Sequence, residues 1–252
     1  MLVHEGLLSR SRGGNTYFTS PNKPIFSSNF ASGDPSLEWG NLLSSGTGTN
    51  RLVKNDYAQG YYSLNTTISS SGSYDHFEQN IGDLNANALI SACIETQFKL
   101  VKMDGSQVTS GTDLGIFGFE FGDVVANAEV ALYYNGSSTV LAVEYPNDAG
   151  YPRVLGSTWT IAPSSTVIPQ NQWVTLKLYF NAGNSGQSNS VISLWMNGVL
   201  VENITGFDAH LETITGVWAG SFNSGFAGSF TGTVESHIAS VIVTTQDPDT
   251  QK

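Results

Sequence analysis

Short segments in which every second residue is apolar dominate this sequence. Successive side chains of an extended strand point to opposite faces, so this spacing is typical of a strand with one buried face. Segments 90–100 and 172–180 both show it. In the second of these, the residues expected to face the core are Val174, Leu176, Leu178 and Phe180. Few stretches follow the 3.6-residue repeat of a helix for more than two turns. The chain is therefore expected to fold as strands.

Turn residues between the apolar segments predict how consecutive strands are connected. Asn197-Gly198 separates the alternating runs 190–196 and 199–204, and this dipeptide tolerates positive φ at both positions of a type I′ hairpin turn. Asn135-Gly136 predicts a second hairpin. Further strands are expected at 25–30, 51–54, 60–67, 74–81, 115–121, 128–134, 138–145, 157–161, 214–222 and 229–245. More than ten short strands without intervening helices predict an all-β fold, an antiparallel two-sheet β-sandwich of the jelly-roll kind.

The 252 residues suit one large β domain with a polar segment at each end. We place the sandwich at residues 25–245, an N-terminal arm at 1–24 and a polar tail at 246–252. The arm holds Arg10, Arg12 and Lys23, which are three of only 10 cationic residues in the chain. In a protein otherwise strongly acidic, this local positive charge favours docking of the arm onto an acidic neighbour or another subunit.

Charge and cysteine content exclude several classes of protein. The 21 acidic residues against 10 basic ones give a net charge of −11, which disfavours nucleic-acid binding because clustered cations are missing. No apolar run approaches the roughly 18 residues of a membrane-spanning helix. Residues 1–14 lack the apolar core of a conventional signal peptide. Cys93 is the single cysteine, so an internal disulfide is excluded, and its apolar neighbours predict a buried thiol.

Several motifs occur in the order found in one known superfamily. They are Phe30 to Trp39, Ala58 to Leu64, the Trp-x-Asn-Gly hairpin of Leu194 to Val201, and His237 to Val243. Over residues 25–245 the chain resembles the concanavalin A-like, laminin G-like jelly rolls. The resemblance implies the fold. It does not choose among lectins, adhesion domains, glycoside hydrolases, polysaccharide lyases and virion proteins, so function must be argued from the site.

Carboxylate motifs for glycoside hydrolysis are not visible in the sequence. A retaining hydrolase on this scaffold needs two carboxylates about 5 Å apart, commonly from one Glu-x-Asp-x-x-Glu strand. Glu120 and Asp123 are three residues apart and so fall on opposite faces of a strand. Glu78 and Glu95 can pair only if the strand register brings them together. No catalytic residue is predicted.

Lyase chemistry also lacks its usual motifs. A polysaccharide lyase of this fold uses a Tyr or His base and neutralises a uronate carboxylate with Arg, Gln or Asn. His76, Gln79, Gln97 and His237 are the available groups. The Arg-rich, Gln-x-His and Tyr-x-Lys strands of the family do not appear, and ten cations in an acidic chain suit a polyanionic substrate poorly.

Glycan binding without catalysis requires an aromatic platform and a few polar partners. The candidates for this role are Trp195, Trp218, Tyr133, Glu95 and Gln97. No cofactor is expected. A structural calcium ion is left open, because carboxylates lie in turn-like segments at Asp34, Asp104, Asp113, Asp123 and Asp148.

A jelly roll without export signal, disulfide or catalytic motif suggests a non-catalytic structural or adhesion protein. We therefore expect a virion component, a phage capsid decoration or tail or fibre protein, that binds itself, other virion proteins or a cell-surface glycan. It would be located in the virion or extracellularly. Two alternatives stay open: a polysaccharide-degrading enzyme, lyase more than glycoside hydrolase, and a secreted lectin-like carbohydrate-binding module.

Overall fold

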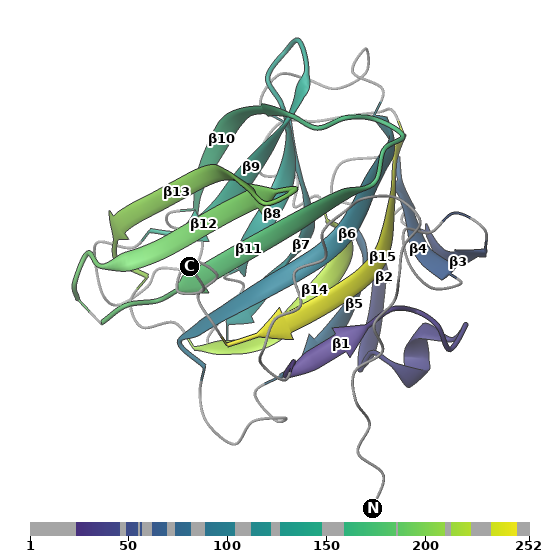
Figure 1. Cartoon of the computed structure of the whole chain (residues 1–252), viewed down its shortest axis with the longest axis horizontal. Coiled ribbons are helices and arrows are strands. Elements are labelled where there is room, and N and C mark those ends of the chain that lie inside the picture. Colours follow the sequence, from purple (N-terminus) through teal and green to yellow (C-terminus); the bar gives the residue numbers. More distant parts are fainter. Residues whose placement is uncertain are drawn as a thin grey trace, which may run out of the picture.

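The computed structural model confirms an all-β fold of two antiparallel sheets that pack face to face (Figure 1). It describes residues 24–45, 49–54, 56, 62–69, 74–81, 89–103, 112–121, 127–147, 159–184, 186–209, 213–222 and 233–245. Among these residues the single helical element is a 3-10 turn, η1 (Pro35–Leu37). None of the described helical structure is long and apolar enough to cross a membrane.

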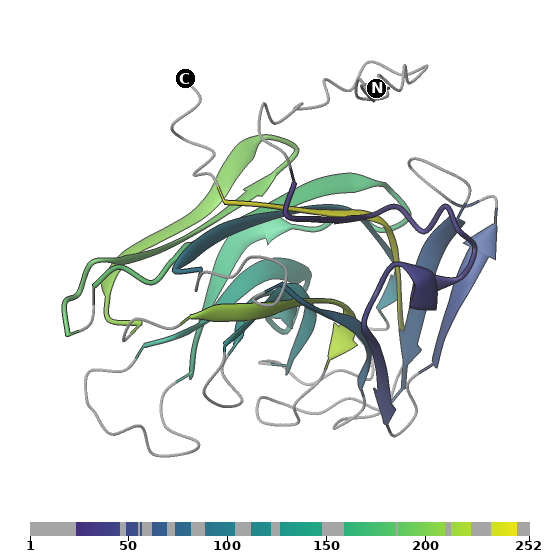
Figure 2. The ribbon, with the colours of Figure 1, turned by 90° about the horizontal axis from the view of Figure 1, so that it is seen from below.

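Eight strands form one sheet and seven form the other. The eight-stranded sheet runs in the order β13 (Val199–Phe207), β12 (Ser190–Met196), β11 (Val174–Asn181), β6 (Ser91–Met103), β15 (Val234–Thr244), β4 (Tyr62–Ile68) and β3 (Thr49–Lys54), with β1 (Phe26–Ser28) paired to β15. The seven-stranded sheet runs β10 (Trp159–Val167), β9 (Thr139–Pro146), β8 (Asn127–Tyr134), β7 (Thr112–Phe121), β14 (Ile214–Phe222), β5 (Tyr74–Asn80) and β2 (Asn41–Ser45). Figure 2 shows the eight-stranded sheet curving over the other sheet.

Apolar side chains from alternate positions of both sheets fill the space between them. The predicted inward set on β11 is confirmed, with exposed fractions of 0 to 2% for Val174, Leu176, Leu178 and Phe180. On β12, Ile192 and Leu194 are fully buried beside them. From the seven-stranded sheet, Phe117 and Phe119 meet them and are fully buried. Each such side chain contributes about 1.5–3 kcal/mol when removed from water. This burial determines which side chains must lie on the two outer faces.

The two predicted hairpins both form, with different turns. Asn197 and Gly198 have φ of 52° and 79°, as a type I′ turn requires, and they connect β12 to β13. Asn135 and Gly136 connect β8 to β9, but only Gly136 has positive φ. There the Asn135 side chain accepts hydrogen bonds from the backbone N–H groups of Ser137 and Ser138, at 3.0 and 2.9 Å.

Segment 30–39, whose motif resembles an opening strand, forms a loop that includes the 3-10 turn η1. Strand β1 ends at Ser28, and the following loop is organised by the carboxylate of Glu38. This carboxylate accepts hydrogen bonds from the N–H groups of Phe30 at 3.0 Å and Ser32 at 3.1 Å, and from Ser28 Oγ at 2.6 Å. Burial alone would raise the pKa of Glu38, but these hydrogen bonds lower it below its ordinary value. Strand β2, which follows this loop, was not predicted.

The predicted terminal segments lie outside the described residues. This applies to residues 1–23, with Arg10, Arg12 and Lys23, and to 246–252. The docking role of the arm therefore stays a prediction. Cys93 is buried at 4% exposure, but it lies on the outer face of the eight-stranded sheet in a small cluster with Tyr179 and Trp195.

Replacing Gly198 by Val should lower the free energy of unfolding by about 1–2 kcal/mol, because a β-branched residue adopts φ of 79° only with strain. Urea denaturation monitored by circular dichroism measures this change. Leu200→Val, in the same hairpin on an exposed strand position, is the control and should have a smaller effect. Equal stability losses in both variants would contradict the strained-turn explanation.

Candidate active site

The outer face of the seven-stranded sheet carries carboxyl groups, aromatic rings and glycines on its central strands. Phe77, Phe119 and Val217 point into the core, so their neighbours along β5, β7 and β14 point outward. The outward side chains include His76, Glu78, Glu120 and Trp218.

Strand register aligns these groups in rows across the sheet. Glu78 on β5 lies opposite Trp218 on β14, and Trp218 lies opposite Gly118 on β7. Gly118 lies opposite Glu129 on β8, which in turn lies opposite Glu144 on β9. One row across five strands thus contains three carboxyl groups and an indole ring.

Glu78 is the centre of a hydrogen-bonded triad. His76 Nε2 lies 2.9 Å from Glu78 Oε1, on the same strand and the same face. The carboxyl group of Glu120, two strands away, also hydrogen-bonds to Glu78. The triad therefore joins an imidazole and two carboxyl groups in direct contact.

A glycine on the intervening strand makes the contact between the two glutamates feasible. Strand β14 separates β5 from β7, and its residue Gly216 lies opposite Glu120. A Cβ atom at Gly216 would overlap with Oε2 of Glu120, so the Glu120 carboxyl group lies directly over this glycine. Any larger residue at 216 would block the path from Glu120 to Glu78.

The two glutamates have pKa values shifted in opposite directions. Burial is the main reason that the pKa of Glu120 is raised to about 8, and the adjacent charge of Glu78 adds to the shift. The hydrogen bond with His76 is the main reason that the pKa of Glu78 is lowered, although burial opposes it. At neutral pH the pair therefore consists of a protonated Glu120 and an ionised Glu78.

A carboxylic acid beside a carboxylate can act as a general acid and a general base. Opposite pKa shifts in neighbouring groups are the property that distinguishes such roles in enzymes. Glu78 has 21% of its side chain exposed and Glu120 is half-buried, so both are accessible from solvent. No other group of described residues combines exposure with this protonation pattern.

Trp218 packs against the triad. Its ring packs on the imidazole of His76, with centroids 5.4 Å apart. It also lies over Gly115, where an added Cβ would come within 2.9 Å of the ring. With 2% exposure, Trp218 holds His76 in place and offers little surface to a sugar.

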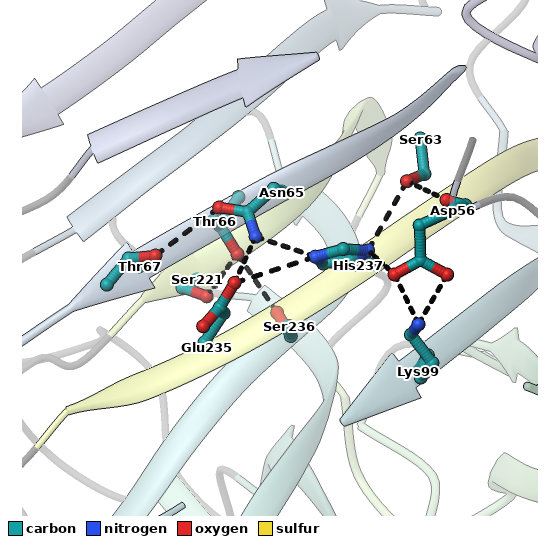
Figure 3. Close-up of polar contacts among 10 residues, drawn as sticks. All are labelled: Asp56, Ser63, Asn65, Thr66, Thr67, Lys99, Ser221, Glu235, Ser236 and His237. Atoms are coloured by element: carbon teal, nitrogen blue, oxygen red, sulfur yellow. Dashed lines mark hydrogen bonds and ion pairs between the residues drawn. The ribbon is translucent and has the colours of Figure 1, made fainter. Parts of the chain in front are cut away.

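A second polar cluster lies on the opposite face of the molecule, on the eight-stranded sheet (Figure 3). His237 Nδ1 lies 2.9 Å from Asp56 Oδ2, and Asp56 also forms an ion pair with Lys99. His237 Nε2 lies 2.6 Å from Asn65 Nδ2, and the same amide donates to Glu235 Oε1 at 2.6 Å.

The bonding in this cluster occupies both ring nitrogens of His237. A neutral ring fits these contacts. Nδ1 then carries the proton and donates it in a hydrogen bond to Asp56, and Nε2 accepts a hydrogen bond from the Asn65 amide. Burial lowers the pKa of His237 below its ordinary value, and the charge of Asp56 opposes the shift. Ser63 Oγ approaches Nδ1 at 3.4 Å, the nitrogen that already contacts Asp56, so a Ser-His-Asp relay is not formed. The cluster links strands rather than offering a base to a substrate.

The residues predicted to bind glycan are divided between the two faces. Trp218 and Tyr133 lie on strands of the seven-stranded sheet. Trp195, Glu95 and Gln97 lie on the eight-stranded sheet. There, Trp195 is 8% exposed, Glu95 pairs with Lys177 at 2.8 Å, and Gln97 donates to Thr175 at 2.6 Å. The structure does not bring the five residues into one surface.

Sequence reasoning missed the pairing of Glu78 with Glu120. Glu95, considered as a partner of Glu78, belongs to the other sheet, and Asp123 lies outside the described residues. One signal was present in the sequence of β14, where Gly216 and Gly220 alternate with the core residues Val217 and Ala219. Glycine at outward strand positions indicates close approach of another group.

Metal binding finds no support in the described part of the chain. It contains no group of three His, Cys, Asp or Glu residues able to hold a metal ion. Asp34 caps η1, where its side chain accepts from the Ser36 N–H group. Asp113 lies on β7, and Asp104, Asp123 and Asp148 are outside the described residues. A structural calcium ion stays an open alternative.

Comparison with solved structures identifies the fold. Over 82% of this chain and 91% of the other, the structure matches an endo-β-1,4-glucuronan lyase from the fungus Trichoderma reesei, with a TM-score of 0.61 and 14% identity. A marine alginate lyase from Aplysia kurodai matches over 89% and 100%, with a TM-score of 0.60 and 11% identity. An alginate lyase from a Chlorella virus matches over 86% and 97%, with a TM-score of 0.56 and 10% identity. No family model and no curated protein matches the sequence.

The chain therefore has the jelly-roll β-sandwich fold found in polysaccharide lyases. These comparisons contradict the expectation of a non-catalytic virion component, because the similar structures are polysaccharide-degrading enzymes. A match encoded by a bacteriophage, at 15% identity, is described as a carbohydrate esterase rather than a capsid or fibre protein. The alternative of a polysaccharide-degrading enzyme agrees better with the findings.

Glu120→Gln should weaken the pH dependence of stability between about pH 4.5 and pH 8. In this window the folded protein keeps the Glu120 proton, whose pKa is raised to about 8, while the unfolded chain releases it. The native state then binds more protons, so stability falls as pH rises. Urea titrations across this window measure the effect. Parallel curves for the variant and the wild type would contradict a raised pKa at Glu120.

Gly216→Ala should separate the two glutamates and lower the pKa of Glu120 towards its ordinary value. The new methyl group would occupy the position of Glu120 Oε2 and force the side chain away from Glu78. Carboxyl carbon NMR titration of the glutamates measures the change. Gly40→Ala is the control, since a Cβ there meets its nearest atoms at 3.5 Å, and it should leave the titration of Glu120 unaltered.

Proposed function

We propose that this protein is a polysaccharide-degrading enzyme that cleaves glycosidic bonds at the outer face of the seven-stranded sheet. The observation that carries the proposal is the hydrogen-bonded pair of Glu78 and Glu120, with pKa values shifted apart. The jelly-roll fold, shared with several polysaccharide lyases, supports it as an analogy of architecture. We also propose that the chain belongs to the concanavalin A-like superfamily.

Glu120 acts as the general acid in this proposal. Cleavage of a glycosidic bond needs a proton on the departing sugar oxygen, and a carboxylic acid still protonated at neutral pH can supply it. Burial keeps Glu120 in this form. Removal of this acid by substitution is expected to slow cleavage by about 10²–10⁴-fold.

Glu78 acts as the base. Its hydrogen bond with His76, at 2.9 Å, keeps the carboxylate ionised and oriented. Trp218 in turn packs against His76, so the base is supported by two residues of the same face. His76 is a positioning residue in this arrangement, since it contacts Glu78 rather than the reacting bond.

The direct contact between the two carboxyl groups describes the free enzyme. In glycoside hydrolases the two groups are separated by about 5–9.5 Å, which leaves room for the sugar or for water. A glycosidic oxygen that enters between Glu78 and Glu120 must therefore displace the Glu120 side chain. Because Gly216 has no Cβ atom beneath the Glu120 side chain, this side chain can rotate with little steric hindrance.

Glu120→Gln and Glu78→Gln should each reduce polysaccharide cleavage by at least 10²-fold, because each removes one of the two proton-transfer groups. The assay measures new reducing ends across a panel of neutral and uronic polysaccharides. Glu202→Gln, on strand β13 of the other sheet, is the matched control and should keep full activity. Circular dichroism spectra of all variants should be equal.

The proposal fails if the wild-type protein cleaves no member of the panel. It also fails if Glu120→Gln cleaves as fast as the wild type, which would place the chemistry elsewhere. His237→Gln provides a further comparison, because it changes the closed cluster on the eight-stranded sheet. Loss of activity in that variant, with normal folding and with Glu120→Gln active, would move the active site to the opposite face.

A further inference from the structure

We infer that the substrate is an uncharged polysaccharide and that its cleavage is a hydrolysis. The inference rests on the proposed function and adds the substrate class and the reaction. The inferred substrate and reaction differ from those of the similar solved structures, which are lyases of alginate and glucuronan.

The two sheets differ sharply in charge. Among the described strands, every Lys and Arg lies in the eight-stranded sheet: Arg51, Lys54, Lys99, Lys102 and Lys177. The described strands of the seven-stranded sheet contain none. Their ionisable acids are Asp75, Glu78, Asp113, Glu120, Glu129 and Glu144.

Glu78, Glu129 and Glu144 form a row with the proposed reaction centre. A polyuronate lying on this face would bring one carboxylate per sugar beside the partly exposed Glu78 and Glu144 and over Glu129, which is buried at 3% exposure. Like charges repel more strongly near a protein surface than in bulk water, because the effective dielectric constant is lower there. The face is therefore unfavourable for a polyanion and neutral towards an uncharged chain.

β-Elimination also requires a charge-stabilising group, and the described strands of this sheet contain no Lys or Arg that could serve as one. The base removes a proton from the carbon beside the uronate carboxylate, and the resulting negative charge must be stabilised by a cation or strong hydrogen-bond donors. Hydrolysis of an uncharged chain needs only an acid, a base and water. Glu120 and Glu78 supply the first two.

The hydrolytic step balances with these two groups. Glu120 gives its proton to the bridging oxygen, and the bond between that oxygen and the anomeric carbon breaks. A water oxygen bonds to the anomeric carbon, and a proton of this water passes to Glu78. The products are two shorter chains, one with a new reducing end. The proton then returns from Glu78 to Glu120 through their direct hydrogen bond, which restores the starting state.

Pairs of polysaccharides that differ only in oxidation at the C6 position test this inference. Suitable pairs are β-1,4-glucan with β-1,4-glucuronan, mannan with mannuronan, and galactan with galacturonan. We expect new reducing ends from at least one neutral member, without the ultraviolet absorbance of an unsaturated uronate. In ¹⁸O-labelled water, the label should appear at the new reducing end.

Charge discrimination can be measured separately through inhibition. Uronate oligomers should inhibit the wild type at least tenfold more weakly than neutral oligomers of equal length. Glu144→Gln should reduce this difference between inhibition by uronate and by neutral oligomers, because it removes one carboxyl group from the row at a half-buried position. Glu202→Gln, on the other sheet, should leave this difference in inhibition unchanged.

Cleavage of a uronate polymer with an unsaturated product would overturn the inference and leave the proposed function standing. Hydrolysis of uronate and neutral members at equal rates would overturn the substrate class alone. Failure to cleave any member of the three pairs or of the wider panel would overturn the proposed function as well. The three results are distinguishable in the same assay by reducing ends and ultraviolet absorbance.

Discussion

The burial of one face of every central strand is the constraint on which the rest of this structure depends. Phe117 and Phe119 on β7, Val217 and Ala219 on β14 and Phe77 on β5 all have to point between the sheets. A shift of one residue in any of these strands would expose its apolar set to water, so the register is firmly specified. Once the register is set, the neighbours of every outward side chain are set too. The position of Glu78 beside Trp218 and the carboxyl row across the sheet are consequences of core packing.

Local signals in the sequence predicted most of the fold, because they act between neighbouring residues. Alternation located β11, and Asn197-Gly198 located the β12–β13 turn through its own backbone preference. Two elements near the N-terminus were not predicted correctly. The loop after β1 is held by hydrogen bonds to Glu38, a residue several positions further along. Strand propensity depends on the residues themselves and does not include such contacts. Strand β2 contains Leu42-Leu43, which breaks the alternation that identifies a half-buried strand.

The candidate site could not be predicted in the same way. Glu78 and Glu120 belong to strands that are not consecutive in the chain, and the strand between them, β14, comes from residues beyond 210. Their contact depends on two registers, β5 with β14 and β14 with β7, and on the absence of a side chain at Gly216. Motif reasoning looked first for two carboxylates on one strand, as in the hydrolases of this architecture. The one pair that it considered on different strands, Glu78 with Glu95, joins residues of different sheets. Outward glycines on β14 were the available clue.

The raised pKa of Glu120 gives this residue its proposed reactivity and also lowers the stability of the folded protein. Burial and the charge of Glu78 raise its pKa to about 8, so the folded protein holds a proton that the unfolded chain would release at neutral pH. A structure selected for stability alone would separate the two carboxyl groups, and alanine at 216 would be sufficient to do so. Instead, three elements maintain the contact: Gly216 leaves the space, His76 fixes Glu78, and Trp218 fixes His76. Such a supported, unfavourable pair is what a catalytic role would require, because the acid is useful only while it remains protonated beside an ionised base.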